Sequence, residues 1–133
     1  MIERHRANQR MSQVVSCGAM VFLAGQVAHD TSADITGQTG QILDQIDELL
    51  ELAGTGKSSL LAVTIWLADI REFQAMNAVW DAWIDPSNPP ARACVEARLG
   101  RPELKVEIQA TAMRQQPPSN NDSFAHFNQV NCK

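Results

Sequence analysis

Two short segments near the end of the chain, 90–99 and 104–112, carry the side chains best suited to chemistry. Both alternate as strands do, so that residues two apart share a face. Arg92 and Cys94 lie on the polar face of the first segment, and Glu107 lies on the polar face of the second. A solvated sheet face explains this pattern. So does a site on one face, where an arginine grips a carboxylate with paired hydrogen bonds and a glutamate handles a proton or a water.

Length and composition indicate a globular protein of one domain. The chain has 133 residues, of which 44% are hydrophobic and 20% are charged. A chain of this size buries roughly two-thirds of its unfolded surface, which is enough for a core. The formal net charge is −4. Because nucleic-acid binders carry a basic footprint, we expect no nucleic-acid partner.

Cysteine and histidine usage favours a cytoplasmic protein without a metal centre. The three cysteines include no CxxC pair, and their odd number is typical of a reducing compartment. The longest apolar run, 60–68, is too short to cross a bilayer, so no membrane partner is expected. The histidines lie far apart and without ligand spacing, so no metal site is predicted.

The periodicity predicts the element order ββαβαββ. Gly18 favours a tight turn between the first two strands, and Gly54 is placed to end the first helix. Helices at this spacing favour an α+β two-layer sandwich with both helices on one sheet face. On pattern alone, the last two strands pair as a hairpin. The predicted elements are strands 12–16 and 19–25, helix 33–53, strand 60–68, helix 71–84, and strands 91–99 and 104–112.

The two helices carry the predicted helical part of the core. Apolar residues recur at helical spacing in both, which places one stripe of each against the sheet. The tryptophans on the predicted core elements are expected to pack rather than to stack on bases. The stripe residues are Ile42, Ile46, Leu49, Leu50 and Ala53 in the first helix, and Phe73, Met76, Trp80, Trp83 and Ile84 in the second.

Four segments together resemble a known family. They are P-A-R-A-C-V-E at 90–96, K-V-E-I at 105–108, the helix at 75–83, and the Gly25-Gln26 pair. Over about residues 13–113 the chain resembles the YjgF/YER057c/UK114 family, the Rid family of reactive imine/enamine deaminases. The resemblance implies a chorismate-mutase-like fold with a mixed β-sheet. It also implies that the last strand lies inside the sheet and that the 91–99 strand lies at its edge.

The resemblance also implies roles for individual residues. Arg92 corresponds to the family's ligand for the substrate carboxylate, and Glu107 to the catalytic glutamate that activates or orients water. The carbonyl of Cys94 is expected to line the pocket. At two substrate-binding positions this chain departs from the best-known members, with Met11 in place of a tyrosine and Ala24 in place of a serine. Substrate orientation is therefore the property that these departures affect.

The expected activity is hydrolysis of 2-imino acids, or their enamine tautomers, to 2-keto acids and ammonia. The family resemblance implies a homotrimer with sites between neighbouring chains, and no cofactor. Two alternatives stay open: a non-catalytic trimer that binds small carboxylates, and an endoribonuclease. Residues 1–114 are predicted to form the Rid-like domain. Residues 115–133, rich in Gln, Pro, Ser and Asn, are predicted to form a polar tail.

Overall fold

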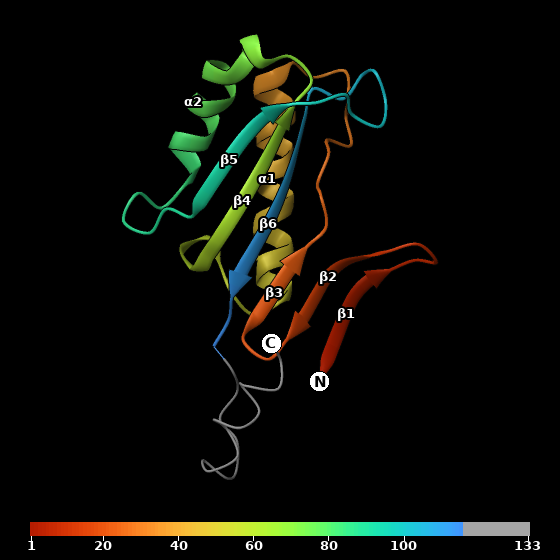
Figure 1. Cartoon of the computed structure of the whole chain (residues 1–133), viewed down its shortest axis with the longest axis vertical. Helices are drawn as coiled ribbons and strands as arrows, with labels where there is room; N and C mark the ends of the chain where they lie inside the picture. The colour runs from red at the N-terminus through yellow and green to blue at the C-terminus, as the bar shows by residue number, and fades with distance from the viewer. Residues whose placement is uncertain (116–133) are drawn as a thin grey trace.

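Two helices cover one face of a six-stranded mixed sheet in the computed structural model, which describes residues 1–115 (Figure 1). This is the α+β architecture that the sequence predicted. The sheet order is β1-β2-β3-β6-β4-β5, and only the β4–β5 pair is parallel. The elements are β1 Ile2–Ala7, β2 Ser12–Cys17, β3 Met20–Leu23, α1 Ile35–Leu52, β4 Leu60–Leu67, α2 Phe73–Trp83, β5 Ala91–Glu96 and β6 Val106–Met113.

The first strand was not predicted. β1 reads IERHRA, and its residues are almost all exposed at the edge of the sheet beside β2. Neither an apolar alternation nor a turn signal marks such a strand, because an edge strand with solvent around it needs no buried face. The observed order is therefore βββαβαββ, one strand longer at the start than the predicted order.

The last two strands do not pair as a hairpin. β4 lies between β5 and β6, so β5 occupies the edge and β6 lies inside the sheet. The hairpin expected from pattern alone was therefore wrong, and the arrangement implied by the family resemblance is confirmed. The physical reason is the helix α2 between β4 and β5, because a crossover helix is what lets consecutive strands run parallel.

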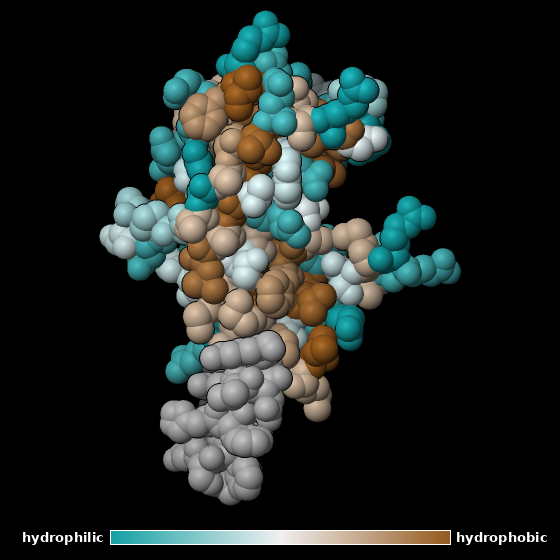
Figure 2. All heavy atoms as spheres, in the orientation of Figure 1, coloured by the Kyte–Doolittle hydropathy of each residue, from teal (hydrophilic) through white to brown (hydrophobic). Residues whose placement is uncertain are grey.

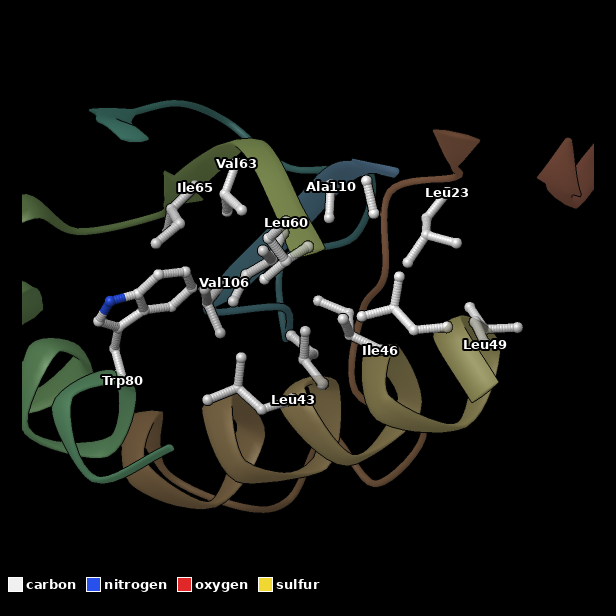
Figure 3. Packing of buried hydrophobic residues seen from close by; sticks show 14 of the residues in the cluster. Leu23, Leu43, Ile46, Leu49, Leu60, Val63, Ile65, Trp80, Val106 and Ala110 are labelled. Carbon is white, nitrogen blue, oxygen red and sulfur yellow. The ribbon is translucent and has the colours of Figure 1, made fainter. Parts of the chain in front are cut away.

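The core lies between the helices and one face of the sheet (Figure 3). Leu43 and Ile46 of α1 and Trp80 of α2 point toward Ile65 and Val106 of the sheet. Every predicted stripe residue of α1 is buried, whereas in α2 only Met76 and Trp80 are buried and the others are partly covered. Burying an apolar side chain of this size contributes about 1.5–3 kcal/mol, so this layer provides much of the stability.

Local signals fix the ends of α1. Asp34 caps its start, because its carboxylate accepts a hydrogen bond from the Gly37 N–H at 2.9 Å. Gly54 follows its end with φ of 84°, a left-handed conformation that glycine adopts without strain. The helix therefore runs within the predicted range of 33–53.

Candidate functional site

Arg92 lies on the sheet face that the helices cover. In the parallel β4–β5 pair, Arg92 stands beside Val63 and Cys94 beside Ile65. Val63 and Ile65 are core residues, 3% and 0% exposed, and neighbouring residues in a ladder point to the same side. The side chains of Arg92 and Cys94 therefore point toward α2, at the open edge of the sheet.

Glu107 lies on the opposite face. Val106 and Ile108 on either side of it are fully buried against the helices, so Glu107 points the other way, beside Trp66 of β4. The prediction that Arg92 and Glu107 share one polar face was therefore wrong. Alternation shows which residues of one strand share a face, but it does not show which of those faces the helices cover.

The exposure of the apolar residues of β5 also contradicts the prediction of a shared polar face. Because Arg92 and Cys94 were assigned to the polar face of this strand, the small residues that alternate with them would be expected to face the core. Ala91, Ala93 and Val95 are instead exposed, Val95 to 47%, on the open face of the sheet. The polar row of β5 therefore faces the helices, where Arg92 meets the rings of Phe73 and Trp80 on α2.

Two of those rings hold the Arg92 guanidinium. Its Cζ lies 5.2 Å from the ring centroid of Trp80 and 6.0 Å from that of Phe73. Both distances are within the range of cation–π contacts. Within residues 1–115, Arg92 makes no ion pair, and its guanidinium donates no hydrogen bond to another side chain or carbonyl. The arrangement therefore leaves the N–H donors of a half-buried cation available to an anion.

Glu107 is held against the backbone of the Gly25-Gln26 pair. The N–H of Gln26 donates to the carbonyl of Ile108 at 2.8 Å, and the N–H of Ile108 donates to the carbonyl of Gln26 at 3.1 Å. A Cβ atom on Gly25 would overlap Glu107 Oε2, so any larger residue here would displace the carboxylate from its observed position. In the described part of the chain the Glu107 carboxylate has no cationic partner.

Buried glutamines fix the backbone on both sides of this contact. Gln26 donates to Gln13 Oε1 at 2.8 Å and accepts from Gln45 of α1 at 3.1 Å. Gln38 of α1 is fully buried, donates to the Glu103 carbonyl and accepts from the Lys105 N–H. Because buried amides are costly unless paired, these bonds hold the start of β6 and the Gly25-Gln26 segment in one position.

The structure places Ala24 directly before Gly25, the residue that packs against Glu107, and places Met11 in the loop between β1 and β2. Ala24 directly precedes Gly25 and is half-buried, and its N–H donates to the Gln13 carbonyl at 2.9 Å. Met11 lies in the turn between β1 and β2, with 41% of its side chain exposed. The missing serine hydroxyl thus belongs to the Glu107 half of the candidate site.

Cys94 is a half-buried free thiol on the Arg92 side of the sheet. Burial raises the pKa of the Cys94 thiol, and the nearby positive charge of Arg92 offsets part of that rise. A thiol with a raised pKa carries little thiolate at neutral pH, which argues against a nucleophile. Its predicted contribution through the backbone carbonyl does not depend on the thiol.

Sequence reasoning assigned Phe73 and Trp80 to the core and missed their contact with Arg92. Asn77 stands between them on the same helix face, and its buried Oδ1 has no hydrogen-bond partner among residues 1–115. Phe73, Asn77 and Trp80 have the spacing of one helix face. That spacing would have predicted a contact with Arg92 if the sequence had shown that α2 packs on β5, the strand that follows it.

Other features of the described chain point elsewhere. A hollow of about 840 Å³ lies at the β5–β6 connection, lined by residues 96–102 with Ala68 and Leu104, and it includes neither Arg92 nor Glu107. Residues 1–115 contain no cluster of three metal-ligating side chains. No helix in the same part is long and apolar enough to cross a membrane.

The open face of the sheet is unusually apolar for a surface. Phe22 and Met113 are each 44% exposed, and Val95 is 47% exposed. In Figure 2 this face is mostly brown, tan and white, with the teal residues concentrated toward the rim. Exposed apolar patches of this kind mark interaction surfaces.

Comparisons with known proteins agree on one family. The family model described as Endoribonuclease L-PSP matches residues 1–114. A RutC family protein of Haemophilus ducreyi is 43% identical over 112 residues, which are 84% of this chain and 96% of that protein. The 2-iminobutanoate/2-iminopropanoate deaminase of Escherichia coli is 34% identical over 110 residues, 77% of this chain and 85% of that protein.

A solved structure gives the same result for the fold. A YjgF-family protein from Neisseria meningitidis superposes with a TM-score of 0.85 at 39% sequence identity, covering 88% of this chain and 98% of that chain. The family model spans the whole sheet together with Arg92 and Glu107. The chain therefore belongs to the YjgF/YER057c/UK114 family, also called the Rid family.

Proposed function

We propose that this chain is a cytoplasmic hydrolase of 2-imino acids and their enamine tautomers, producing 2-keto acids and ammonia. The site is built between copies of the chain in a homotrimer. The activity is that named for the 34% identical Escherichia coli relative. The observation that carries the proposal is the pair of unneutralised charges, Arg92 and Glu107, on opposite faces of one sheet.

Two copies are needed because one chain cannot bring these charges to one ligand. The sheet and its buried side chains separate Arg92 from Glu107. A half-buried cation and a half-buried anion without ionic partners are costly unless something completes them. A second copy that seats its β5 edge near the open face of the first supplies both halves, and the apolar open face favours such an association.

The proposed reaction needs three things from the protein: a carboxylate ligand, a positioned water and a base. Arg92 binds the substrate carboxylate with two parallel hydrogen bonds, which only a guanidinium fork provides. The iminium carbon is already electrophilic, so water needs positioning and a base. Glu107 of the neighbouring copy accepts a proton as water adds to the C=N bond. Glu107 then returns that proton to the nitrogen of the carbinolamine, which expels ammonia as its hydroxyl loses a proton to water and becomes the carbonyl of the keto acid.

An assay with semicarbazide tests the activity. An amino-acid oxidase, with catalase present, generates 2-iminobutanoate or 2-iminopropanoate, and semicarbazide traps the imine that survives. We expect the protein to lower semicarbazone formation, with the Escherichia coli deaminase as the positive control. Unchanged semicarbazone at high protein concentration, while the control lowers it, would remove the hydrolase proposal.

Mixed assemblies test the two-copy site. Arg92→Ala and Glu107→Gln proteins are each expected to be nearly inactive. When the two are unfolded together and refolded, about a quarter of the sites in random trimers combine an intact Arg92 with an intact Glu107. Activity should return to about that fraction of wild type. No recovery in assemblies whose mixed composition is verified by mass would place both residues in one chain's site.

Light scattering tests the trimer separately. We expect a mass of three chains at micromolar concentration, because the open face is too apolar to remain in water. A monomeric mass would contradict the proposal.

A binding module without turnover is the second candidate, and Met11 and Ala24 favour it. Both positions lack a hydroxyl that the best-known members carry, and Ala24 adjoins the Gly25 contact with Glu107. Calorimetric titration with 2-ketobutyrate or benzoate separates the two functions. Binding of these acids together with unchanged semicarbazone formation would support the module.

Ribonuclease activity is the third candidate, because the matching family model carries that description. The net charge of −4 argues against an RNA partner. Within the described residues, His5 lies 3.9 Å from Glu3 and His29 lies 3.4 Å from Gln45, and neither histidine has an observed contact with Arg92. Cleavage of RNA by nuclease-free preparations that survives Arg92→Ala would support this candidate.

A further inference from the structure

We propose that Phe73 and Trp80 are positioning residues, an aromatic shelf on α2 that holds the Arg92 guanidinium ready for an anionic ligand. The inference rests on the proposed role of Arg92 as the carboxylate ligand. It adds that the geometry of this arginine is set by rings rather than by a carboxylate of its own chain.

The topology builds the shelf. α2 connects β4 to β5 and packs over the strand that it precedes, so its face meets the Arg92 side of the sheet. Phe73 and Trp80 are seven residues apart, which is two helical turns and therefore one face. Trp80 is 6% exposed and belongs to the core cluster, so its ring is a fixed support.

A guanidinium held by aromatic rings keeps its N–H donors available, whereas one held by a carboxylate does not. Arg71 shows the ionic case, because its Nε and Nη2 atoms both donate to the carboxylate of Asp69 at 2.8–3.1 Å. Those donors and that charge are satisfied. A guanidinium stacked on aromatic rings is attracted through its face, so the N–H groups at its edge stay free. Arg92 is therefore both held and unsatisfied, which is what a receptor for a carboxylate requires.

Substitutions that keep the side chain apolar, compared with a matched change at a neighbouring ring, separate positioning from packing. Trp80→Leu removes the ring, and Trp80→Phe restores one. Trp83→Leu removes an aromatic ring from the same helix, where Trp83 contacts Trp80 and Lys57 and makes no ring contact with Arg92. Each variant is checked for an unchanged mass and circular dichroism, and 2-ketobutyrate affinity is then measured by calorimetric titration.

We expect Trp80→Leu to weaken 2-ketobutyrate binding roughly three- to thirtyfold, the range that corresponds to a partly desolvated cation–π contact. KM for the imine should rise while kcat changes less, because the arginine acts in binding. Trp80→Phe should recover most of the affinity, and Trp83→Leu should change it about twofold or less. Wild-type affinity in Trp80→Leu, or equal loss in Trp80→Phe and Trp80→Leu, would overturn the shelf.

NMR provides a readout that does not depend on activity. The Arg92 side-chain protons should be shifted upfield by the Trp80 ring, and Trp80→Leu should remove that shift while Trp83→Leu retains it. If wild-type protein binds 2-ketobutyrate without hydrolysing imines, the hydrolase proposal fails and the shelf stands. If it binds neither 2-ketobutyrate nor benzoate, the shelf's role toward a ligand is overturned.

Discussion

The two faces of the sheet hold the two halves of the candidate site in different ways. On the helix face, Arg92 is supported by the rings of Phe73 and Trp80. On the open face, Glu107 is supported by backbone, with Gly25 packed against its carboxylate. Arg92 is therefore positioned by side chains of the crossover helix α2. Glu107 is positioned by its strand and by the space that Gly25 leaves beside its carboxylate.

The difference shows how each half can be damaged. The Arg92 half is built on ring contacts, so we expect it to tolerate an exchange of one ring for another. The Glu107 half depends on space, because any Cβ at position 25 meets the carboxylate. In both halves the charged group is half-buried and lacks an ionic partner within residues 1–115, which is the state expected of a site that a second copy completes.

The largest expected effect is that of Glu107→Gln. The amide keeps the size of the side chain but cannot accept a proton, so kcat should fall about 10²–10⁴-fold, the usual range for a general base. Affinity for 2-ketobutyrate should change far less. Steady-state kinetics and calorimetry provide both numbers, with Glu103→Gln in the exposed β5–β6 connection as the control. An unchanged kcat would show that Glu107 is structural.

Gly25→Ala should have the next largest effect. The new methyl group overlaps Glu107 Oε2, so the flexible end of the glutamate must move. Misplacement of a catalytic group by about 1 Å costs on the order of a hundredfold in rate. Gly100→Ala is the control, because a Cβ there meets nothing within 4 Å. If Gly25→Ala retained full activity, the position of the Glu107 carboxylate against Gly25 would have no part in catalysis.

On the helix face, Arg92→Lys should weaken carboxylate binding almost as much as Arg92→Ala. Lysine keeps the charge but loses the planar fork, so carboxylate affinity should fall about tenfold to a hundredfold. Calorimetric titration is paired with a mass measurement in the same buffer. An intact trimer that binds 2-keto acids with wild-type affinity would remove Arg92 from the site. A weaker trimer with unchanged affinity would mean that Arg92 only joins adjacent chains.

The smallest effect concerns Cys94. Burial raises the pKa of this thiol and the charge of Arg92 lowers it, so Arg92→Met should raise the pKa further. The thiolate fraction at about pH 8 then falls, and alkylation of Cys94 by iodoacetamide should slow roughly two- to fivefold. Peptide mass mapping across pH measures the rate, with Arg98→Met as the control. Faster alkylation in Arg92→Met would show that the guanidinium limits access of the reagent to the thiol more than it stabilises the thiolate.

The sequence predicted most of the fold because its signals are local. The stripe of α1, the β-branched run of β4 and the turn at Gly18 each predict one element from its own residues. The candidate residues were equally visible, since Arg92 and Glu107 stand in short motifs. β1 was missed because an exposed edge strand has no buried face to reveal it.

What the sequence by itself determined is which residues of one strand share a face, and which elements form. Tertiary structure alone decided that β4 separates β5 from β6, that α2 covers the polar row of β5, and that Glu107 therefore faces away from Arg92. The physical reason is that the two faces of a strand differ only in what packs on them. Side-chain alternation is a property of the chain, whereas the choice of the covered face depends on strand order, register and the crossover helix.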